Sequence, residues 1–422
     1  MNLLVVGSGG REHAIIRKLR ESPRVDTIFC APGNGGISAD ARCVDIKATD
    51  LEQMVAFAQQ NAVDFAVVAP DDPLVLGMVD AMNAAGIPAF GPTKAAAAIE
   101  GSKVFSKDLM KRYGIPTAAY ESFDDPAAAI AYLKAQNRYP AVIKADGLAL
   151  GKGVIIAESE AEAVEAVRSM MQEGAFGESG RRVVIEEFLT GIEVSVLSFT
   201  DGKTVLPMAS SMDHKRALDG DQGLNTGGMG TIAPHPLYSP EMAARCMEEI
   251  FLPSIRAMNA EGREFRGCLY FGLMLCADGP KVIEYNCRFG DPETQVVLPL
   301  LESDLLEVML ATAEQRLSSL TLRWRAQSAA CVVIASGGYP VAYQKGYPID
   351  GLGADGQADG VTVYHAGTRC VNGVYQSNGG RVLGVTATGD TLRMALDRAY
   401  AAADTIGFEG SFFRHDIGAK VL

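Results

Sequence analysis

The residues best suited to chemistry form a strand-like stretch in the third quarter of the chain. Glu284 and Asn286 are two positions apart, so in a β-strand both side chains point to the same side of the sheet. Ile283 and Tyr285 are expected to pack behind them. A carboxylate and an amide oxygen, completed by nucleotide phosphates and water, are ligands that Mg²⁺ prefers. Arg288 continues the alternation and can clamp a phosphate or a carboxylate. The alternative is a strand whose polar side only meets solvent, and the density of polar groups on that side disfavours it.

A second candidate is the glycine-rich stretch from Lys144 to Gly153. A P-loop would need four residues before its Gly-Lys pair, then Ser or Thr and a helix. Here three residues precede Gly151-Lys152, Gly153 replaces the hydroxyl residue, and a β-branched run follows. The segment is therefore predicted to be a hairpin that closes over nucleotide phosphates as a flap. A surface hairpin with solvated lysines is the alternative.

The first predicted strand ends in a glycine-rich turn, Gly7 to Gly10, followed by Arg11 and Glu12. A dinucleotide-binding motif would place its third glycine where Glu12 stands, and an acidic residue at the end of the second strand, where none occurs. The turn is instead expected to hold a phosphate on backbone N–H groups at a helix N-terminus, assisted by Arg11. A turn that only lets the helix pack on the sheet is equally consistent with this motif.

Two further clusters offer groups to a nucleotide or an anion. An apolar strand ends at Glu186-Glu187, whose backbone is placed to meet an adenine edge, and Glu193 can then reach ribose hydroxyls. Farther on, Lys215 and its basic neighbours lie next to a glycine-rich loop in an otherwise acidic protein, which favours an anion site. A base role for His214 is disfavoured, because activating a carboxyl group with ATP needs no strong base.

The composition indicates an acidic globular protein. The chain has 422 residues, 48% hydrophobic and 21% charged, which suggests about two to four domains. A net charge of −13 would repel nucleic-acid backbones and anionic membranes. No apolar run approaches the roughly 18 residues that span a bilayer, and the first residues are expected to form a strand, not a signal peptide. Eight cysteines without a C-x-x-C pair favour buried thiols in a reducing cytoplasm over zinc or disulfides.

Strand and helix signals alternate over residues 1–100, which is the rhythm of a parallel, doubly wound sheet. The predicted elements are strands at 3–6, 25–30 and 65–69 and helices at 11–20, 50–61 and 74–85. This pattern predicts an N-terminal α/β domain.

Residues 117–325 show a different pattern of predicted elements, because strands there come in antiparallel pairs with helices between them. Two such pairs are predicted, 141–145 with 154–157 and 267–276 with 281–286. Ser102 is expected to cap a helix that runs to about Tyr113, and Ser239 to cap another that begins with proline. After Trp324 the chain is rich in glycine and β-branched residues, which indicates a third region.

Taken together, these motifs resemble those of ATP-grasp ligases, and within them the phosphoribosylamine–glycine ligases. The matching blocks keep their order along the chain: Gly-x-Gly-Gly-Arg-Glu-His-Ala at 7–14, Ala-Pro-Gly-Asn at 31–34, Gly-Ser-Lys at 101–103, Lys-Ala-Asp-Gly-Leu-Ala at 144–149, Asp-His-Lys-Arg at 213–216, Asn-Thr-Gly-Gly-Met-Gly at 225–230, Glu-Tyr-Asn-Cys-Arg-Phe-Gly-Asp-Pro-Glu-Thr-Gln at 284–295 and Asn-Gly-Gly-Arg-Val-Leu at 378–383. The resemblance implies an N-terminal doubly wound parallel sheet that binds substrate (1–101), a two-lobed ATP-grasp α+β domain (102–325, with a flap subdomain at about 120–190) and a small β-rich C-terminal domain (326–422).

These ligases join glycine to 5-phosphoribosylamine, so the resemblance implies ATP as a substrate, Mg²⁺ or Mn²⁺ as the metal, and small molecules as the only partners. The metal is expected at Glu284 and Asn286. The residues implied for catalysis are Lys144, Arg288, Asp213 and Lys215. Those implied for ATP are Lys103, Lys144, Gly151, Lys152, Gly153, Glu186, Glu187, Phe188, Leu189 and Glu193. Those implied for the other substrates are Gly9, Gly10, Arg11, Glu12, Asn34, Asp71, Asp213, Asn225, Thr226, Gly227, Arg288 and Gly290.

The chain departs from the family pattern in three places. Asp71 stands where glutamate is usual, which shortens a possible substrate contact, and Leu224 stands where proline is common. No acid occurs at 271–273, where many ATP-grasp enzymes carry a metal ligand, so two protein ligands are expected. The alternatives are a ligase for another acid and amine, an NAD-dependent oxidoreductase, which Glu12 disfavours, and a silent nucleotide-binding regulator. The expected state is a monomer, with a weak dimer as the alternative.

Overall fold

The N-terminal region is built on a sheet of parallel strands in the order β3-β2-β1-β4-β5. The computed structural model describes residues 1–148, 153–174 and 176–422. The elements of this first region are β1 (Asn2–Gly7), α1 (Gly10–Leu19), β2 (Thr27–Pro32), α2 (Ile37–Asp40), β3 (Arg42–Cys43), α3 (Leu51–Gln60), β4 (Phe65–Val68), α4 (Asp71–Leu76), α5 (Met78–Ala84), β5 (Ala89–Phe90) and α6 (Lys94–Gly101). The predicted parallel sheet is confirmed. The single helix predicted at 74–85 is wrong: Gly77 adopts φ +100°, and the chain breaks there into α4 and α5.

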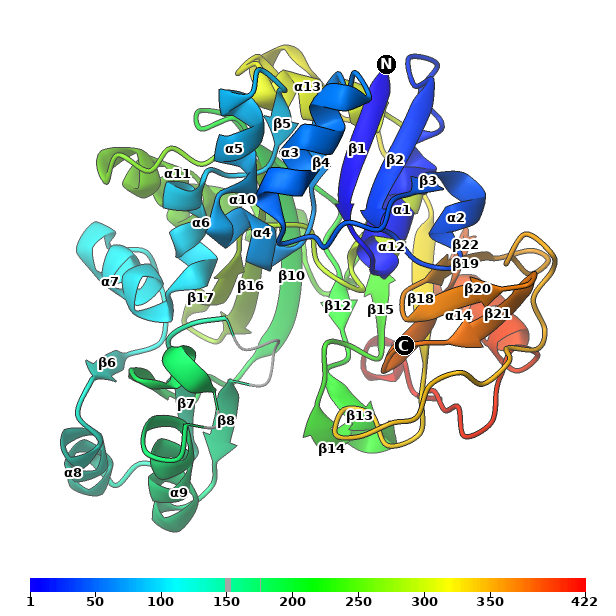
Figure 1. The fold of residues 1–422 in the computed structure, drawn as a ribbon. Helices are drawn as coiled ribbons and strands as arrows, with labels where there is room; N and C mark the ends of the chain where they lie inside the picture. The colour runs from blue at the N-terminus through cyan, green and yellow to red at the C-terminus, as the bar shows by residue number, and fades with distance from the viewer. Residues whose placement is uncertain (149–152, 175) are drawn as a thin grey trace.

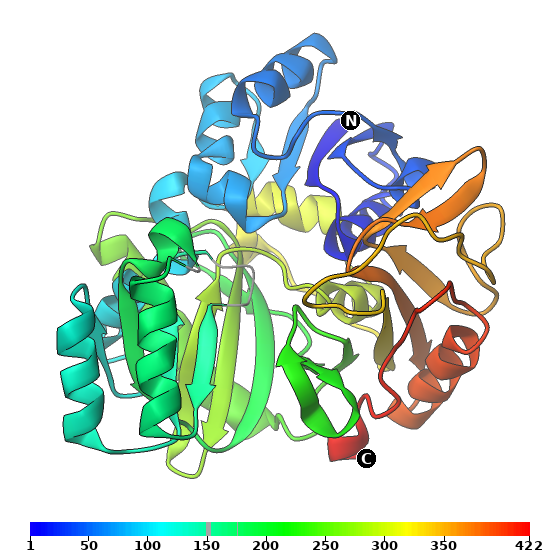
Figure 2. The same ribbon diagram turned by 60° about the horizontal axis from the view of Figure 1, so that its bottom comes forward.

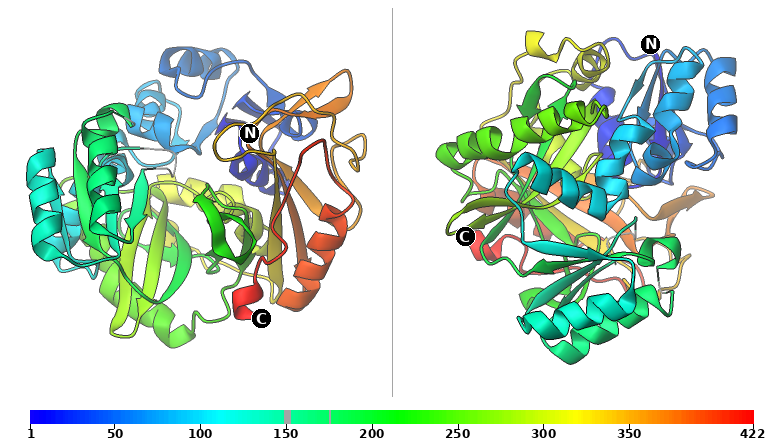
Figure 3. Two further views of the ribbon diagram at one scale, coloured as in Figure 1. Left: turned by 90° about the horizontal axis from the view of Figure 1, so that it is seen from below. Right: turned by 90° about the vertical axis from the view of Figure 1, so that its left-hand side faces the viewer.

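The next region is a small lobe around an antiparallel sheet in the order β6-β9-β7-β8. Its elements, with the helix that leads into it, are α7 (Lys103–Tyr113), β6 (Tyr120–Phe123), α8 (Pro126–Gln136), β7 (Ala141–Ala145), β8 (Val154–Ala157), α9 (Glu160–Met171), η1 (Gly177–Gly180) and β9 (Val183–Glu187). Ser102 caps α7 by accepting from the Phe105 amide, and Gly114 ends it in the left-handed conformation, as predicted. Helices α8 and α9 cover one face of the sheet and form its core with it (Figure 3).

A larger lobe follows, around an antiparallel sheet in the order β11-β10-β16-β17. Its elements are β10 (Ile192–Thr200), β11 (Val205–Pro207), α10 (Pro240–Cys246), η3 (Met247–Phe251), α11 (Leu252–Ala260), β16 (Gly267–Cys276), β17 (Gly279–Asn286), α12 (Thr294–Val297), η4 (Leu298–Leu300), α13 (Leu305–Ala313) and η5 (Leu317–Ser319). Ser239 caps α10 as predicted, and π-helical η3 joins α10 to α11. Figure 1 shows this lobe between the small lobe and the C-terminal region.

One expectation for β17 is wrong. Its register with β16 shifts, so that Gly272 faces Glu284 whereas the next residue, Leu273, faces Val282. Ile283 is left as the extra residue of a β-bulge. Val282 is therefore buried together with Tyr285, and Ile283 is only half-buried.

The C-terminal region contains an antiparallel sheet in the order β12-β15-β18-β22-β19. The elements here are β12 (Met212–Asp213), β13 (Arg216–Leu218), η2 (Asp219–Asp221), β14 (Gln222–Asn225), β15 (Gly230–Ala233), β18 (Ser328–Ala335), β19 (Thr362–His365), β20 (Thr368–Val371), β21 (Val374–Ser377), β22 (Arg381–Gly389), α14 (Leu392–Ala403) and η6 (Ala419–Val421). Strands β12 and β15 come from before the boundary predicted at 325. Figure 2 shows the hairpin of β13 and β14 between the large lobe and the end of the chain.

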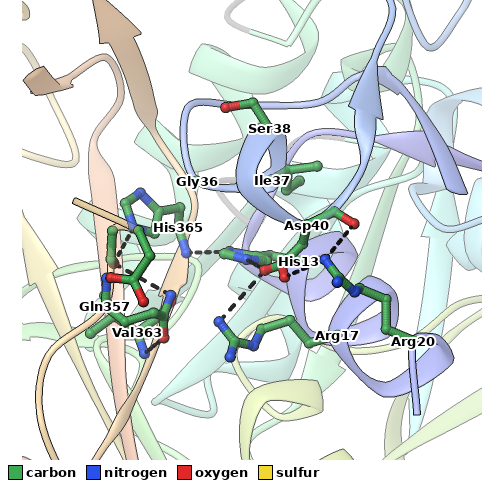
Figure 4. A network of polar contacts seen from close by, with 12 residues as sticks. His13, Arg17, Arg20, Gly36, Ile37, Ser38, Asp40, Gln357, Val363 and His365 are labelled. Carbon is green, nitrogen blue, oxygen red and sulfur yellow. Dashed lines mark hydrogen bonds and ion pairs between the residues drawn. The ribbon is translucent and has the colours of Figure 1, made fainter. Parts of the chain in front are cut away.

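A buried histidine pair ties the N-terminal and C-terminal regions together (Figure 4). The backbone N–H of His365 donates to Nδ1 of His13 at 2.8 Å, and Nε2 of His13 lies 3.0 Å from Oδ2 of Asp40. Because Nδ1 accepts, Nε2 carries the proton and donates to Asp40. Burial lowers the pKa of His13, although Asp40 acts in the opposite direction. Arg17 and Arg20 complete the charge balance around Asp40.

Candidate active site

The two predicted metal ligands, Glu284 and Asn286, lie at the C-terminal end of β17. Glu284 faces Gly272 on β16, and Asn286 faces Tyr270. A Cβ at position 272 would lie 3.1 Å from Cγ of Glu284. Gly272, which stands where an acidic residue would be on β16, therefore leaves room for the Glu284 side chain. Burial would raise the pKa of Glu284, but the positive charges of the neighbouring cations lower it overall; these are Lys215, Lys144, Lys103 and Arg288. Glu284 is therefore held as a carboxylate.

Arg288 lies at the centre of a polar cluster just beyond β17. Its Nη2 atom donates to Oδ1 of Asn286 at 3.0 Å and lies 3.0 Å from Oε1 of Glu100 and 3.8 Å from Oδ2 of Asp71. Burial would lower the pKa of Arg288, and the two carboxylates raise it overall. The predicted residues Asp71, Asn286 and Arg288 thus meet.

Glu100 belongs to this cluster and was missed by sequence reasoning. Its Oε2 atom also accepts the backbone N–H of Cys287 at 2.7 Å, so one side chain holds two successive residues after β17. Burial raises the pKa of Glu100, and Arg288 acts in the opposite direction. Its position in the alanine-rich helix α6, directly before the Gly-Ser-Lys block, was the available signal. Cys287 is fully buried on the packed side.

Three lysines, on α7 and β7, lie where the small lobe meets the large one. Nζ of Lys103 donates to the Gly147 carbonyl at 3.1 Å, which joins α7 to the base of the predicted flap. Nζ of Lys144 lies 2.9 Å from Oε1 of Glu186. The third, Lys107, was not predicted. It lies one helical turn after Lys103 on the same face of α7, which is the signal that could have found it.

The predicted hinge runs from Glu186 to Leu189 at the end of β9. Oε1 of Glu187 accepts the backbone N–H of Ala119 at 2.9 Å, which anchors the hinge to β6. Phe188 is 40% exposed, so an apolar ring is available at the surface of the gap. Glu193 is the second residue of the next strand, β10. Gly153 is the final residue of the predicted flap, and its carbonyl accepts a hydrogen bond from the backbone N–H of Ala145.

Gly151 and Lys152 lie outside the described residues, so the flap tip remains a prediction.

The segment around β12 carries a second group of predicted residues. Nζ of Lys215 donates to Oε2 of Glu193 at 3.3 Å, across from the hinge, and Glu193 raises the pKa of Lys215. Burial, then the neighbouring charge of Glu293, raise the pKa of Asp213. His214 is buried, and burial lowers its pKa to about 4. Gly418 N–H donates to its Nε2, and its Nδ1 faces the Gly230 carbonyl, so no ring nitrogen is free for a substrate.

The glycine-rich loop after β14 is fixed by Arg381, a residue that sequence reasoning quoted in a block but gave no role. Its Nη1 atom donates to the carbonyls of Gly227 at 2.8 Å and Asp291 at 2.7 Å. Thr226 donates to the Lys215 carbonyl and accepts from Gly228, which closes the loop on itself. Asn225 ends β14. The predicted substrate loop is therefore tied to the segment that follows Arg288.

The N-terminal glycine turn packs against that same segment. A Cβ at Gly10 would lie 2.5 Å from Nε2 of Gln295, so glycine lets this turn approach the Gln295 amide closely. The Gly9 N–H donates to Glu12 at 2.5 Å, and Arg11 donates to Glu12 at 2.7 Å. Glu12 thus caps α1 and is nearly fully buried.

The structural partners of two other predicted substrate residues, Asn34 and Gly290, lie within the protein. Asn34 donates to the carbonyls of Ser8 and His365 and accepts the N–H groups of Gly36 and Ile37, so its amide joins the N-terminal and C-terminal regions. Gly290 has no side chain to offer. A Cβ there would collide with Oε2 of Glu293, so glycine allows close packing at this position.

Across residues 1–148, 153–174 and 176–422, no three His, Cys, Asp or Glu side chains form a metal cluster, and no helix is long and apolar enough to cross a membrane.

The comparisons with known proteins cover the chain from end to end. Models of phosphoribosylglycinamide synthetase match it in three parts: the N domain at 1–100, the ATP-grasp (A) domain at 101–294 and the C domain at 329–420. A phosphoribosylamine–glycine ligase of Vibrio vulnificus (strain CMCP6) is 50% identical over 425 residues, covering 100% of this chain and 99% of its own. One of Caldanaerobacter subterraneus subsp. tengcongensis is 48% identical, covering 99% and 100%.

Solved structures show the same similarity. The crystal structure of phosphoribosylamine–glycine ligase from Thermotoga maritima has a TM-score of 0.85 at 33% identity, covering 99% of this chain and 100% of its own. The biotin carboxylase domain of Hydrogenobacter thermophilus 2-oxoglutarate carboxylase, solved with MgADP, has a TM-score of 0.74 at 17% identity, covering 98% and 91%. That likeness concerns the fold alone.

The two lobes and the charged gap between them define an ATP-grasp enzyme. Within that class, the models of all three phosphoribosylglycinamide synthetase domains match this chain. The chain belongs to the phosphoribosylamine–glycine ligase family. The predicted family and fold class are both confirmed.

Proposed function

We propose that this enzyme joins glycine to 5-phosphoribosylamine with consumption of ATP, giving glycinamide ribonucleotide, ADP and phosphate in purine synthesis. The observation that carries the proposal is the convergence of Lys103, Lys144, Lys215 and Arg288 on one ionised carboxylate, Glu284, at the gap between two ATP-grasp lobes. Such a set of cations neutralises the phosphates of a nucleotide during phosphoryl transfer. Family membership supports the particular acid and amine.

The donor set fits a hard divalent cation. Glu284 supplies a carboxylate and Asn286 an amide oxygen on the same side of β17, and Mg²⁺ takes few protein ligands when phosphates and water supply the rest. Mn²⁺ suits the same oxygens. When bound, the metal ion would neutralise charge on the terminal phosphates. Asn286 is held in place by the hydrogen bond that it accepts from Arg288.

The remaining site residues bind and orient the substrates. Lys103 and Lys144 are proposed to bind the phosphates, the hinge from Glu186 to Leu189 the adenine, and Glu193 the ribose. The flap that ends at Gly153 excludes water, which protects an acyl phosphate from hydrolysis. The N-terminal turn, with Gly9, Gly10 and Arg11, and the loop from Asn225 to Gly227 are proposed to receive phosphoribosylamine.

The reaction proceeds in two steps. A carboxylate oxygen of glycine attacks the γ-phosphorus of ATP, the bond to the bridging oxygen breaks, and ADP leaves. The amine of phosphoribosylamine then attacks the carbonyl carbon of glycyl phosphate, and phosphate leaves with that glycine oxygen. Arg288 is proposed to orient the carboxylate, and its ion pairs with Glu100 and Asp71, which fix the guanidinium, support this role. Asp213 and Lys215 are proposed to line the acceptor side.

An isotope experiment tests this order of events. With ¹⁸O in both carboxylate oxygens of glycine, one label should leave in inorganic phosphate and the other should stay in the amide. Mass spectrometry of the released phosphate measures this directly. Adenylation would instead give labelled AMP and unlabelled pyrophosphate, and that result would refute attack on the γ-phosphorus.

We also propose a monomeric enzyme acting in the cytoplasm on small molecules. Analytical ultracentrifugation over a range of concentrations would test it, and a stable dimer at low concentration would contradict it.

A further inference from the structure

Glu186 lies between two buried lysines at the start of the hinge. Its Oε2 atom is 2.9 Å from Nζ of Lys107, and its Oε1 atom is 2.9 Å from Nζ of Lys144. The side chains of Lys107 and Glu186 are only 3% and 4% exposed, and that of Lys144 is 5% exposed. One carboxylate thus has two counterions in a place where an unpaired charge is strongly disfavoured.

Both lysines also bond to groups other than Glu186. Nζ of Lys107 donates to Oγ1 of Thr117 at 2.8 Å, and that hydroxyl donates to the Val282 carbonyl at 2.7 Å. Nζ of Lys144 donates to the next carbonyl, that of Ile283, at 3.0 Å. Both lysines therefore connect Glu186 to the strand that carries Glu284.

The two lysines differ in where they stand. Lys144 is on β7, at the base of the flap, and its positive charge helps to lower the pKa of Glu284. Lys107 is on α7, packed beneath the hinge, with the ring of Tyr120 5.6 Å away on its other side. If Lys144 turned from Glu186 to the phosphates of ATP, Glu186 would still have Lys107, 2.9 Å away, as its buried partner. Without Lys107, the same movement would leave a buried carboxylate unpaired.

We propose that Lys107 is a positioning residue that keeps Glu186 neutralised, so that Lys144 is free to bind the ATP phosphates. The inference rests on the proposed function, because it takes ATP as the ligand of Lys144. It assigns Lys107 no contact with ATP. The prediction is that Lys107 sets the affinity for ATP and has little influence on the chemical step.

The test compares Lys107→Met with a matched control on the same helix. Lys111→Met removes a lysine one turn farther along α7, at 5.5 Å from the same Tyr120 ring but exposed and without a contact to Glu186. Lys107→Met should raise the KM for ATP roughly tenfold or more, since a buried charge loses its partner on binding, with kcat changed less than about threefold. Lys111→Met should leave both constants unchanged.

Two further variants separate this role from a structural one. In Lys107→Met/Glu186→Gln no carboxylate is left unpaired, so its KM for ATP should be lower than that of Lys107→Met alone, whatever Glu186→Gln does by itself. Lys107→Arg keeps the charge and should restore most of the affinity. Thermal melting of each variant checks that it is folded.

The outcomes are distinct. A KM for ATP in Lys107→Met equal to that of the wild type, or a double variant no better than Lys107→Met, would overturn the role of Lys107 while leaving the proposed function intact. Absence of glycine-dependent ADP release in the wild type would instead refute the proposed function. If Lys107→Met does not fold, the comparison of Lys107→Arg with the double variant decides, because only a charge-balancing role predicts that both bind ATP well.

Discussion

Replacing Glu100 by glutamine should disable the enzyme although Glu100 is not expected to touch a substrate. The side chain is buried, and its two oxygens hold the Arg288 guanidinium and the Cys287 N–H. Glutamine keeps the size and can still accept from Cys287. It removes the negative charge at 3.0 Å from Nη2 of Arg288 and leaves Asp71, at 3.8 Å, as the remaining carboxylate. The perturbation is thus confined to how Arg288 is held.

The distance sets the size of the effect. Two unit charges 3.0 Å apart attract by about 5 kcal/mol at an effective dielectric constant of about 20. Asp71 and the Asn286 amide retain part of the interaction, and measured losses for broken buried pairs are about 3–5 kcal/mol. We take the lower end, about 3 kcal/mol. If it is expressed in the transition state, kcat/KM for glycine falls by about a hundredfold, because each 1.36 kcal/mol is about tenfold in rate.

A coupled assay of glycine-dependent ADP release measures this, with thermal melting alongside. Asp72→Asn is the matched control, because Asp72 is exposed, lies next to Asp71 and makes no ion pair with Arg288 in the described structure. It should keep wild-type kinetics. A Glu100→Gln enzyme with kcat/KM within about twofold of wild type would refute the argument that this carboxylate positions Arg288.

Two other predictions follow from the site and the domain contact. Glu284→Gln and Asn286→Ala should each lower kcat by about 10²–10³-fold with little change in melting, and near-normal turnover of both at saturating Mg²⁺ would remove the metal assignment. Burial lowers the pKa of His365 from its usual 6.5 to about 4, so the stability that the neutral ring contributes is present above pH 6.5 and is lost as pH falls towards 4. That loss amounts to about 2 kcal/mol at pH 5, and urea unfolding should show a steeper decline from pH 7 to 5 in the wild type than in His365→Gln; equal slopes would contradict it.

Local sequence rules were sufficient where one segment determines its own conformation. The cap at Ser102, the stop at Gly114 and the antiparallel hairpins were all predicted, because each depends on neighbours in the chain. The alternation of Glu284 and Asn286 was predicted for the same reason. Ile283 shows where such local prediction fails. A bulge depends on how β16 and β17 align, and no residue of β17 by itself predicts it.

Residues whose importance comes from distant partners were missed, because the local signals that single them out do not say which partner they meet. Glu100 receives the N–H of Cys287 from 187 positions away along the chain. Lys107 matters because Glu186 lies beside it, and Arg381 because two loops cross at its guanidinium. In each case the residue type is ordinary in its local segment. Only the packing of separate segments gives it a partner.

The sheet that combines strands from both sides of position 325 restricts how this protein can be rearranged. β15 pairs with β18 along its full length, from Gly230 opposite Val332 to Ala233 opposite Ala329. A chain cut at 325 would leave β15 with an open edge and would detach the loop after β14 from Arg381. The C-terminal region is therefore not an exchangeable module. A chimera that swaps this region between relatives should also carry residues 212–233 from the same parent. Otherwise the loop after β14 and the Arg381 that holds it will come from different parents.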